Sequence, residues 1–220
     1  MYFVIEGVIG VGKTTLARML QKSFDANLAL EVFEENPFLS DFYSDRQRYA
    51  FQTQIFFLLS RYHQQRESIP AMKKTGKHII SDYTFDKDAL FASINIFGDE
   101  YETYKSVHAA LKEKIVRPDL IVYLRASTET LMQRIALRDR SYERNMEIAY
   151  IEELNQAYED FFITNCKTDC PVLVIDSNKL DYVRNPEDLV WIENRIRQEL
   201  SLPPYQPQLP IDAQDDTPTG

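Results

Sequence analysis

Cysteine, histidine and glycine are scarce in this sequence of 220 residues, and their scarcity excludes several kinds of site. Only two cysteines are present, Cys166 and Cys170, and neither has one of the three histidines close by in sequence. A zinc site would therefore lack ligands, and a disulfide framework needs more cysteines in a smaller chain. We expect a reducing, cytoplasmic compartment.

Long apolar runs and an excess of basic residues are missing as well. The longest apolar run falls far short of the roughly 18 residues that a membrane helix requires, and an apolar strand that begins at residue 2 leaves no room for a signal peptide. Lysine and arginine number 25 against 34 acidic residues, which gives a net charge of −9. This balance disfavours nucleic acid and anionic membranes as partners, so we expect a small-molecule partner.

The composition divides the chain into a domain and a tail. Hydrophobic residues make up 44% of the sequence, enough for the core of one sizeable domain over residues 1–201. From Leu202 onward the chain holds five of the ten prolines and no lysine or arginine. We expect residues 202–220 to form a disordered, proline-rich acidic tail.

Three of the six glycines lie in one loop, Gly7–Thr14, which reads G-x-x-x-x-G-K-T. An apolar strand over residues 2–5 precedes it, and apolar residues at helical spacing follow over 15–24. This context predicts a phosphate-binding loop (P-loop) that cradles ATP, with Lys13 on the β- and γ-phosphates and the Thr14 hydroxyl on Mg²⁺. The residues expected to bind the donor are Gly7, Val8, Ile9, Gly10, Val11, Gly12, Lys13, Thr14 and Thr15.

The rest of the chain alternates strands with helices, a pattern typical of an α/β fold with a parallel sheet. We expect five strands, with helices on both faces of the sheet. The further strands are predicted at 28–33, 77–82, 119–124 and 171–176. Helices are predicted at about 45–68, 86–97, 100–116, 127–137, 145–165 and 186–200. Ligands bind at the carboxyl ends of such strands, so the P-loop, Glu31, Asp82 and the loop after Asp176 should gather at one edge.

Phosphoryl transfer needs a phosphate cradle, Mg²⁺, a base for the acceptor hydroxyl and cations on the transferring group. Asp82, at the end of an apolar strand, can hold Mg²⁺ with Thr14. The arginines at 134, 138 and 140 form a basic patch in an acidic protein and are predicted to be a catalytic lid over the phosphates. For the base, Glu31, Glu34 and Glu35 all compete, and composition does not choose between them.

Several motifs in order resemble the deoxyribonucleoside kinases, from Tyr2 to about Tyr182, and most of all their bacterial purine-preferring members. They are the P-loop, Glu31-Val32-Phe33-Glu34-Glu35-Asn36-Pro37, the stretch from Phe51 to Arg61, and Ala89-Leu90-Phe91-Ala92. The resemblance implies a P-loop kinase fold with Glu31 as the base. It also implies substrate-binding roles for Tyr43 and Glu143 on the sugar 3′-hydroxyl, for Gln54, Arg61 and either Asp88 or Lys87 on the nucleobase edge, and for Phe91 in base stacking. Asp181 and Tyr182 resemble the loop that wraps the adenine of ATP.

The function implied by this resemblance is ATP- and Mg²⁺-dependent phosphorylation of the 5′-hydroxyl of a deoxyribonucleoside, with deoxyguanosine as the first substrate and deoxyadenosine as the second. A homodimer built by the long helices over 45–68 and about 145–162 is implied with it. One position departs from the family pattern. Tyr83 follows Asp82 where the family usually has an arginine that steadies the base carboxylate, a change shared with some bacterial deoxyguanosine kinase-like members.

Two alternatives remain at this point. A thymidylate-kinase-like nucleoside monophosphate kinase would need an arginine for the acceptor phosphate, for which Arg46 or Arg61 could serve. A non-catalytic kinase-like subunit would show eroded phosphate and base motifs, whereas here these motifs are intact.

Overall fold

The computed structural model describes residues 1–32, 35–144, 146–165, 168 and 170–205. Of the sequence predictions, the alternative base Glu34, Cys166 and most of the proposed tail (206–220) lie outside the described residues. Within the described part, no helix is long and apolar enough to cross a membrane.

The centre of the fold is a parallel sheet. Five strands of the described chain pair in the order β2-β3-β1-β4-β5, and every neighbouring pair is parallel. They are β1 (Tyr2–Glu6), β2 (Ala26–Ala29), β3 (His78–Ser81), β4 (Leu120–Arg125) and β5 (Val172–Asp176). The predicted α/β class and five-stranded parallel sheet are confirmed. The central β1 has β3 on one side and β4 on the other, which makes its carboxyl end the expected ligand crevice.

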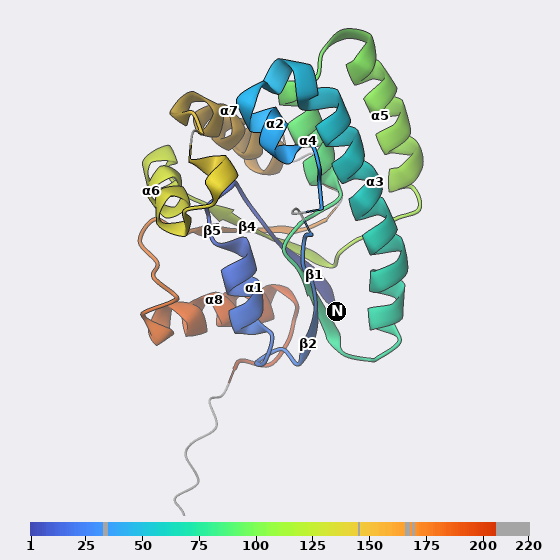
Figure 1. Ribbon diagram of the computed structural model, residues 1–220. Coiled ribbons are helices and arrows are strands. Elements are labelled where there is room, and N and C mark those ends of the chain that lie inside the picture. Colours follow the sequence, from blue (N-terminus) through green and yellow to red (C-terminus); the bar gives the residue numbers. More distant parts are fainter. Residues whose placement is uncertain (33–34, 145, 166–167, 169, 206–220) are drawn as a thin grey trace, which may run out of the picture.

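Helices cover both faces of this sheet, α3 and α5 on one side, α1 and α8 on the other (Figure 1). Because side chains alternate along a strand, Phe3 and Ile5 of β1 enter the larger core with Leu16 of α1, whereas Val4 packs with Ile69 of α3. The helices are α1 (Lys13–Leu20), α2 (Leu39–Ser44), α3 (Arg46–Lys73), α4 (Asp86–Asn95), α5 (Gly98–Lys112), α6 (Thr128–Arg138), α7 (Ile148–Glu159) and α8 (Pro186–Glu199), with a 3₁₀ turn η1 (Ser141–Glu143) and a π-helical turn η2 (Asp160–Thr164).

The second strand is shorter than predicted, and its end fixes the place of Glu31. The sequence predicts a strand over 28–33, but β2 stops at Ala29, because that residue pairs with Ser81, where its partner β3 ends. The chain then leaves the sheet, so Glu31 stands two positions beyond the strand. The apolar pattern continues through Leu30 and Val32, which explains the longer prediction.

Two helical predictions also differ from the structure, and the short helix α2 was not predicted. Helix α3 runs past the predicted end at 68 to Lys73 and holds Pro70 near its end, where the missing N–H removes only one bond of the ladder. The helix predicted over 145–165 is divided into α7 and the π-helical turn η2.

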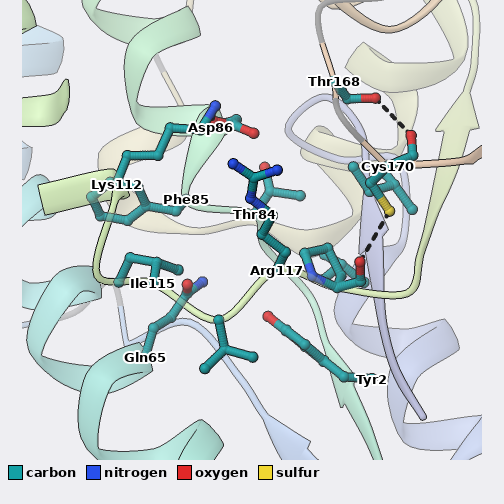
Figure 2. A pocket seen from close by; sticks show the side chains of 14 residues that line it. Tyr2, Gln65, Thr84, Phe85, Asp86, Lys112, Ile115, Arg117, Thr168 and Cys170 are labelled. Carbon is teal, nitrogen blue, oxygen red and sulfur yellow. Dashed lines mark hydrogen bonds and ion pairs between the residues drawn. The ribbon is translucent and has the colours of Figure 1, made fainter.

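A small cavity lies away from the carboxyl edge of the sheet, between Tyr2, Gln65 and the segments around Asp86 and Cys170 (Figure 2). Its volume is about 50 Å³, against roughly 300–1,000 Å³ for pockets that bind drug-sized ligands. The space suits one or two solvent molecules.

Candidate active site

The P-loop leads from β1 into α1 through a backbone that only glycine tolerates. Gly7 and Gly12 have φ angles of +147° and +105°. A Cβ at Gly12 would lie 2.1 Å from the Tyr182 hydroxyl oxygen, and a Cβ at Gly7 would lie 2.4 Å from the Leu124 carbonyl oxygen. These close approaches shape the loop so that its N–H groups and the start of α1 can face a polyphosphate.

Lys13 and Thr14, the first two residues of α1, point into the site from the loop. The Lys13 Nζ donates to the carbonyl oxygens of Gly7 at 2.7 Å and Val8 at 3.1 Å. Burial, followed by the nearby charge of Lys87, lowers the pKa of Lys13 to about 8. The Thr14 hydroxyl donates to the Asp82 carboxylate, so the P-loop is joined directly to the end of β3.

A cavity of about 810 Å³ opens over the P-loop and is large enough for a nucleoside triphosphate. The predicted lid arginines 134, 138 and 140 line it together with Asp181 and Tyr182. Arg134 is held against the loop, because its guanidinium donates to the Val11 carbonyl at 3.1 Å and to the Ser177 carbonyl at 2.8 Å. The buried Tyr182 turns its hydroxyl toward the carbonyls of Val11 and Gly12, beneath the P-loop.

Glu31 lines a second, smaller cavity of about 110 Å³, called the Glu31 cavity below. Its Oε1 accepts from the Arg61 guanidinium, with Nε at 3.0 Å, and its Oε2 lies 2.8 Å from the Lys87 Nζ. Its backbone N–H donates to Asp82 at 2.8 Å. Burial raises the pKa of Glu31, but the charges of Arg61 and Lys87 outweigh burial and hold that pKa well below its usual range. Glu31 is therefore an ionised carboxylate at neutral pH.

The residues predicted to bind the nucleoside line the same cavity as Glu31. They are Tyr43, Gln54, Arg61, Asp82, Phe91 and Glu143. Asp88 is fully buried just behind them and forms an ion pair with Arg61. The structure thus places Asp88 on Arg61 and Lys87 on Glu31. Of the other candidate bases, Glu35 is exposed.

The two cavities meet at the lid. Arg138 and Arg140 line both of them. Arg138 forms a bidentate ion pair with the buried Glu143, with its Nη2 2.6 Å from each carboxylate oxygen. The ring of Tyr43 stacks on that of Tyr142 at 6.0 Å between centroids. The end of α6 therefore borders both the cavity over the P-loop and the Glu31 cavity.

Comparison with known proteins identifies the family to which this chain belongs. The family model for deoxynucleoside kinases matches residues 3–201. The chain belongs to the deoxynucleoside kinase family. It is 34% identical over 199 residues to a deoxyguanosine kinase of Bacillus subtilis (strain 168), which covers 90% of this chain and 96% of the relative. It is also 36% identical over 165 residues to a deoxyadenosine kinase of Dictyostelium discoideum, and this match covers 73% of this chain and 66% of the relative.

The fold of this kinase agrees with a solved relative. The structure of a deoxyadenosine kinase from M. mycoides with bound dCTP matches it with a TM-score of 0.77 and 30% identity, over 90% of this chain and all of that one. The kinase therefore has the P-loop kinase fold, and its activity is the phosphorylation of a nucleoside with a nucleotide as phosphate donor.

Two oxygen groups of the kinase suit a magnesium ion, the Thr14 hydroxyl and the Asp82 carboxylate, which are in contact. Mg²⁺ prefers oxygen ligands and is usually held by one or two carboxylates plus substrate phosphates. The described residues hold no group of three or more Asp, Glu, His or Cys side chains that could hold a metal ion.

Sequence reasoning missed one buried carboxyl of the kinase. Glu6 ends β1 directly before Gly7 and is fully buried. Its Oε2 accepts from the Gly7 N–H at 3.3 Å and from the Tyr158 hydroxyl at 3.5 Å, and among the described residues its Oε1 has no hydrogen-bond partner. Burial raises the pKa of Glu6 to about 7, against the charges of Lys87 and Lys13, which lower it. A charged residue at the end of an otherwise apolar strand was the available signal.

Replacing Glu6 by Gln is expected to stabilise the kinase at pH 8 by about 1 kcal/mol or more, roughly 2–4 °C in Tm for a domain of this size. The folded-state pKa of about 7 lies above the ordinary value of 4.5. Between these values the folded state binds more protons, so the free energy of unfolding of the wild type falls as pH rises through this window and changes no further above it. Thermal melts at pH 5 and pH 8 would measure this, with the exposed-site variant Glu35→Gln as control. A Glu6→Gln protein less stable than wild type at pH 8 would contradict the assignment.

Proposed function

We propose that this kinase transfers the γ-phosphoryl group of ATP, with Mg²⁺, to the 5′-hydroxyl of a deoxyribonucleoside, and that deoxyguanosine is its first substrate. The observation that carries the proposal is the bridge made by Asp82. One of its oxygens accepts from the P-loop Thr14 and the other from the backbone of Glu31. A buried carboxylate thus stands beside a phosphate cradle, as transfer to a hydroxyl requires.

In this mechanism Glu31 is the catalytic base. It takes the proton of the 5′-hydroxyl as the 5′-oxygen attacks the γ-phosphorus. Lys13 and the lid arginines 138 and 140 stabilise the negative charge of the transferring group. Thr14 and Asp82 would hold Mg²⁺, which when bound would neutralise charge on the donor phosphates. Arg134 of α6 donates a hydrogen bond to the Val11 carbonyl and so links the start of the proposed lid to the P-loop.

Recognition of the sugar and the base is assigned to the walls of the Glu31 cavity. Tyr43 and Glu143 lie at its lid side and would bind the 3′-hydroxyl, while Phe91 would stack on the base. Arg61 and Asp88 suit guanine, because the O6 and N7 of guanine accept hydrogen bonds from arginine and its N–H groups can donate to a carboxylate. The cavity of about 110 Å³ is smaller than the roughly 300–1,000 Å³ of pockets that bind drug-sized ligands, so we expect its walls to move apart when a nucleoside binds.

The donor side of the proposal rests on the larger cavity. Its volume and its P-loop floor fit ATP, and Asp181 and Tyr182, which line this cavity, would lie near the adenine. A reducing, cytoplasmic setting is proposed with this donor, since it suits a chain so poor in cysteine.

A coupled assay of ADP release with the four deoxynucleosides and their monophosphates tests the proposal. We expect turnover with deoxyguanosine, weaker turnover with deoxyadenosine, and little with any monophosphate. Faster turnover with a monophosphate than with every nucleoside would instead indicate a nucleoside monophosphate kinase. ATP binding without any turnover would indicate a non-catalytic subunit.

We also propose a homodimer, supported by exposed apolar side chains at neighbouring ends of two helices. Phe97, beside the end of α4, is 71% exposed, and Ile148, at the start of α7, is 62% exposed. Phe97 lines a groove together with Met146 and Glu147, the two residues that precede α7. On the longer helix α3, Leu59 is 42% exposed. Burying such side chains contributes about 1.5–3 kcal/mol each.

Light scattering should therefore find a dimer that the double variant Phe97→Asp/Ile148→Asp converts to monomer, while Trp191→Asp on the distant α8 leaves it unchanged. A wild-type monomer at micromolar concentration would remove the dimer from the proposal.

A further inference from the structure

Among the described residues that line the Glu31 cavity, Lys87 is the one cation to which the proposed mechanism gives no role. It lies in the first turn of α4 and its side chain is 8% exposed. Thr84 fixes the start of this helix, since its hydroxyl oxygen accepts from the Lys87 N–H at 3.1 Å. The Nζ lies 2.8 Å from Glu31 Oε2 and 5.6 Å from the centre of the Phe91 ring. The ammonium group is thus held between the base and the proposed stacking ring.

The position of Lys87 relates it to both the base and the P-loop. Lys87 lines the Glu31 cavity together with Lys13 and Thr14 of the P-loop, and its Nζ lies 2.8 Å from Glu31 Oε2. A cation in this cavity can stabilise the charge that develops on the reacting oxygens during phosphoryl transfer.

Tyr83, which follows Asp82, does not supply this cation. It is fully buried, and its hydroxyl donates to Gln64 Oε1 at 2.6 Å. Gln64 in turn donates from Nε2 to the Leu30 carbonyl at 2.7 Å. Tyr83 thus steadies the backbone next to Glu31 but brings no charge to its carboxylate. One arginine could both position the backbone and neutralise charge. Here Tyr83 contacts the backbone through Gln64, and Lys87 brings the charge.

We propose that Lys87 positions Glu31 through Oε2 and donates to the 5′-oxygen during transfer, while the Tyr83–Gln64–Leu30 chain fixes the backbone of the base. In the reaction the 5′-oxygen loses its proton to Glu31 and forms a bond to the γ-phosphorus. The bond from that phosphorus to the β–γ bridging oxygen breaks, which leaves ADP and a deoxynucleoside 5′-monophosphate. Lys87 keeps its proton throughout. Lys87 holds Oε2 and Arg61 holds Oε1, so both oxygens of the carboxylate are positioned, and in this proposal Oε1 takes the substrate proton. This inference rests on the proposed function.

The test compares Lys87→Met, Lys87→Gln and Lys87→Arg with the matched control Lys112→Met. Lys112 forms an ion pair with Asp86, the residue before Lys87, at 2.5 Å, outside the Glu31 cavity. We expect both neutral variants to lose about 100-fold or more in kcat, with the KM for ATP changed by less than about threefold. Lys87→Arg should recover to within about tenfold of wild type, and Lys112→Met should stay within about twofold. Tyr83→Phe should lower kcat only about fivefold.

Melting curves confirm which variants are folded, and the Gln variant carries the test if the Met variant is not. A folded neutral variant with wild-type kcat overturns the role of Lys87 and leaves the proposed function intact. An arginine variant no more active than the neutral ones overturns the role of the charge. A wild type inactive with all four deoxynucleosides overturns the proposed function, and the assignment of Lys87 with it.

Discussion

Replacing Glu31 by Gln is expected to lower kcat by about two to four orders of magnitude, with a small change in the KM for the deoxynucleoside. The amide has nearly the shape of the carboxylate and can still accept from Lys87, but it cannot take the proton of the 5′-hydroxyl. Rapid-quench measurement of the chemical step, with deoxyguanosine and ATP, would separate this loss from product release.

The matched control for Glu31→Gln is Glu35→Gln, in the same segment but on an exposed side chain. We expect it to behave as wild type. If Glu35→Gln or Glu34→Gln were the damaging change and Glu31→Gln were harmless, the assignment of the base would be wrong.

The second large effect is expected for Asp82→Asn, because this one carboxylate serves both substrates. It accepts from the Thr14 hydroxyl on the donor side and from the Glu31 backbone on the acceptor side. An asparagine can keep only one acceptor oxygen, and it loses the charge that would hold Mg²⁺. We expect kcat to fall by about 100- to 1,000-fold, and the Mg²⁺ concentration for half-maximal rate to rise at least about tenfold. A magnesium titration at saturating ATP measures both.

Asp86→Asn is the control for this change, since Asp86 pairs with Lys112 rather than with the P-loop. It should leave the magnesium titration unchanged. An Asp82→Asn enzyme with normal magnesium dependence would show that this carboxylate acts only on the Glu31 backbone.

The sheet and the P-loop could be predicted from the sequence because their signals are local. Gly7–Thr14 has a fixed spacing, and each buried strand reads as a short apolar run. The end of β2 could not be read in this way. The apolar pattern continues to Phe33, while the true end depends on where β3 stops, which is a property of the pairing.

The choice of base shows the same limit. Composition leaves three glutamates in competition, and the resemblance to the deoxyribonucleoside kinases is what points to Glu31. The fold buries Glu31 between Arg61 and Lys87 and leaves Glu35 exposed. One residue of register leaves open in the sequence whether Lys87 or Asp88 contacts the nucleobase. In the structure Lys87 pairs with Glu31, and Asp88 pairs with Arg61. The raised pKa of Glu6 depends on its burial and on the charges of Lys87, Lys13 and Glu31, which lie far from it in sequence or in other segments, so no local pattern predicts it.

Arg61 has a consequence for anyone who wishes to change the substrate of this enzyme. The same guanidinium contacts Glu31, the proposed base, and Asp88, the proposed reader of the nucleobase. Substitutions that retune the pocket for another base will therefore alter the reactivity of the carboxylate as well. Selectivity and turnover are expected to trade against each other in any variant library at Arg61. Improved mutants should therefore be sought first at Gln54 and Phe91, which line the same cavity.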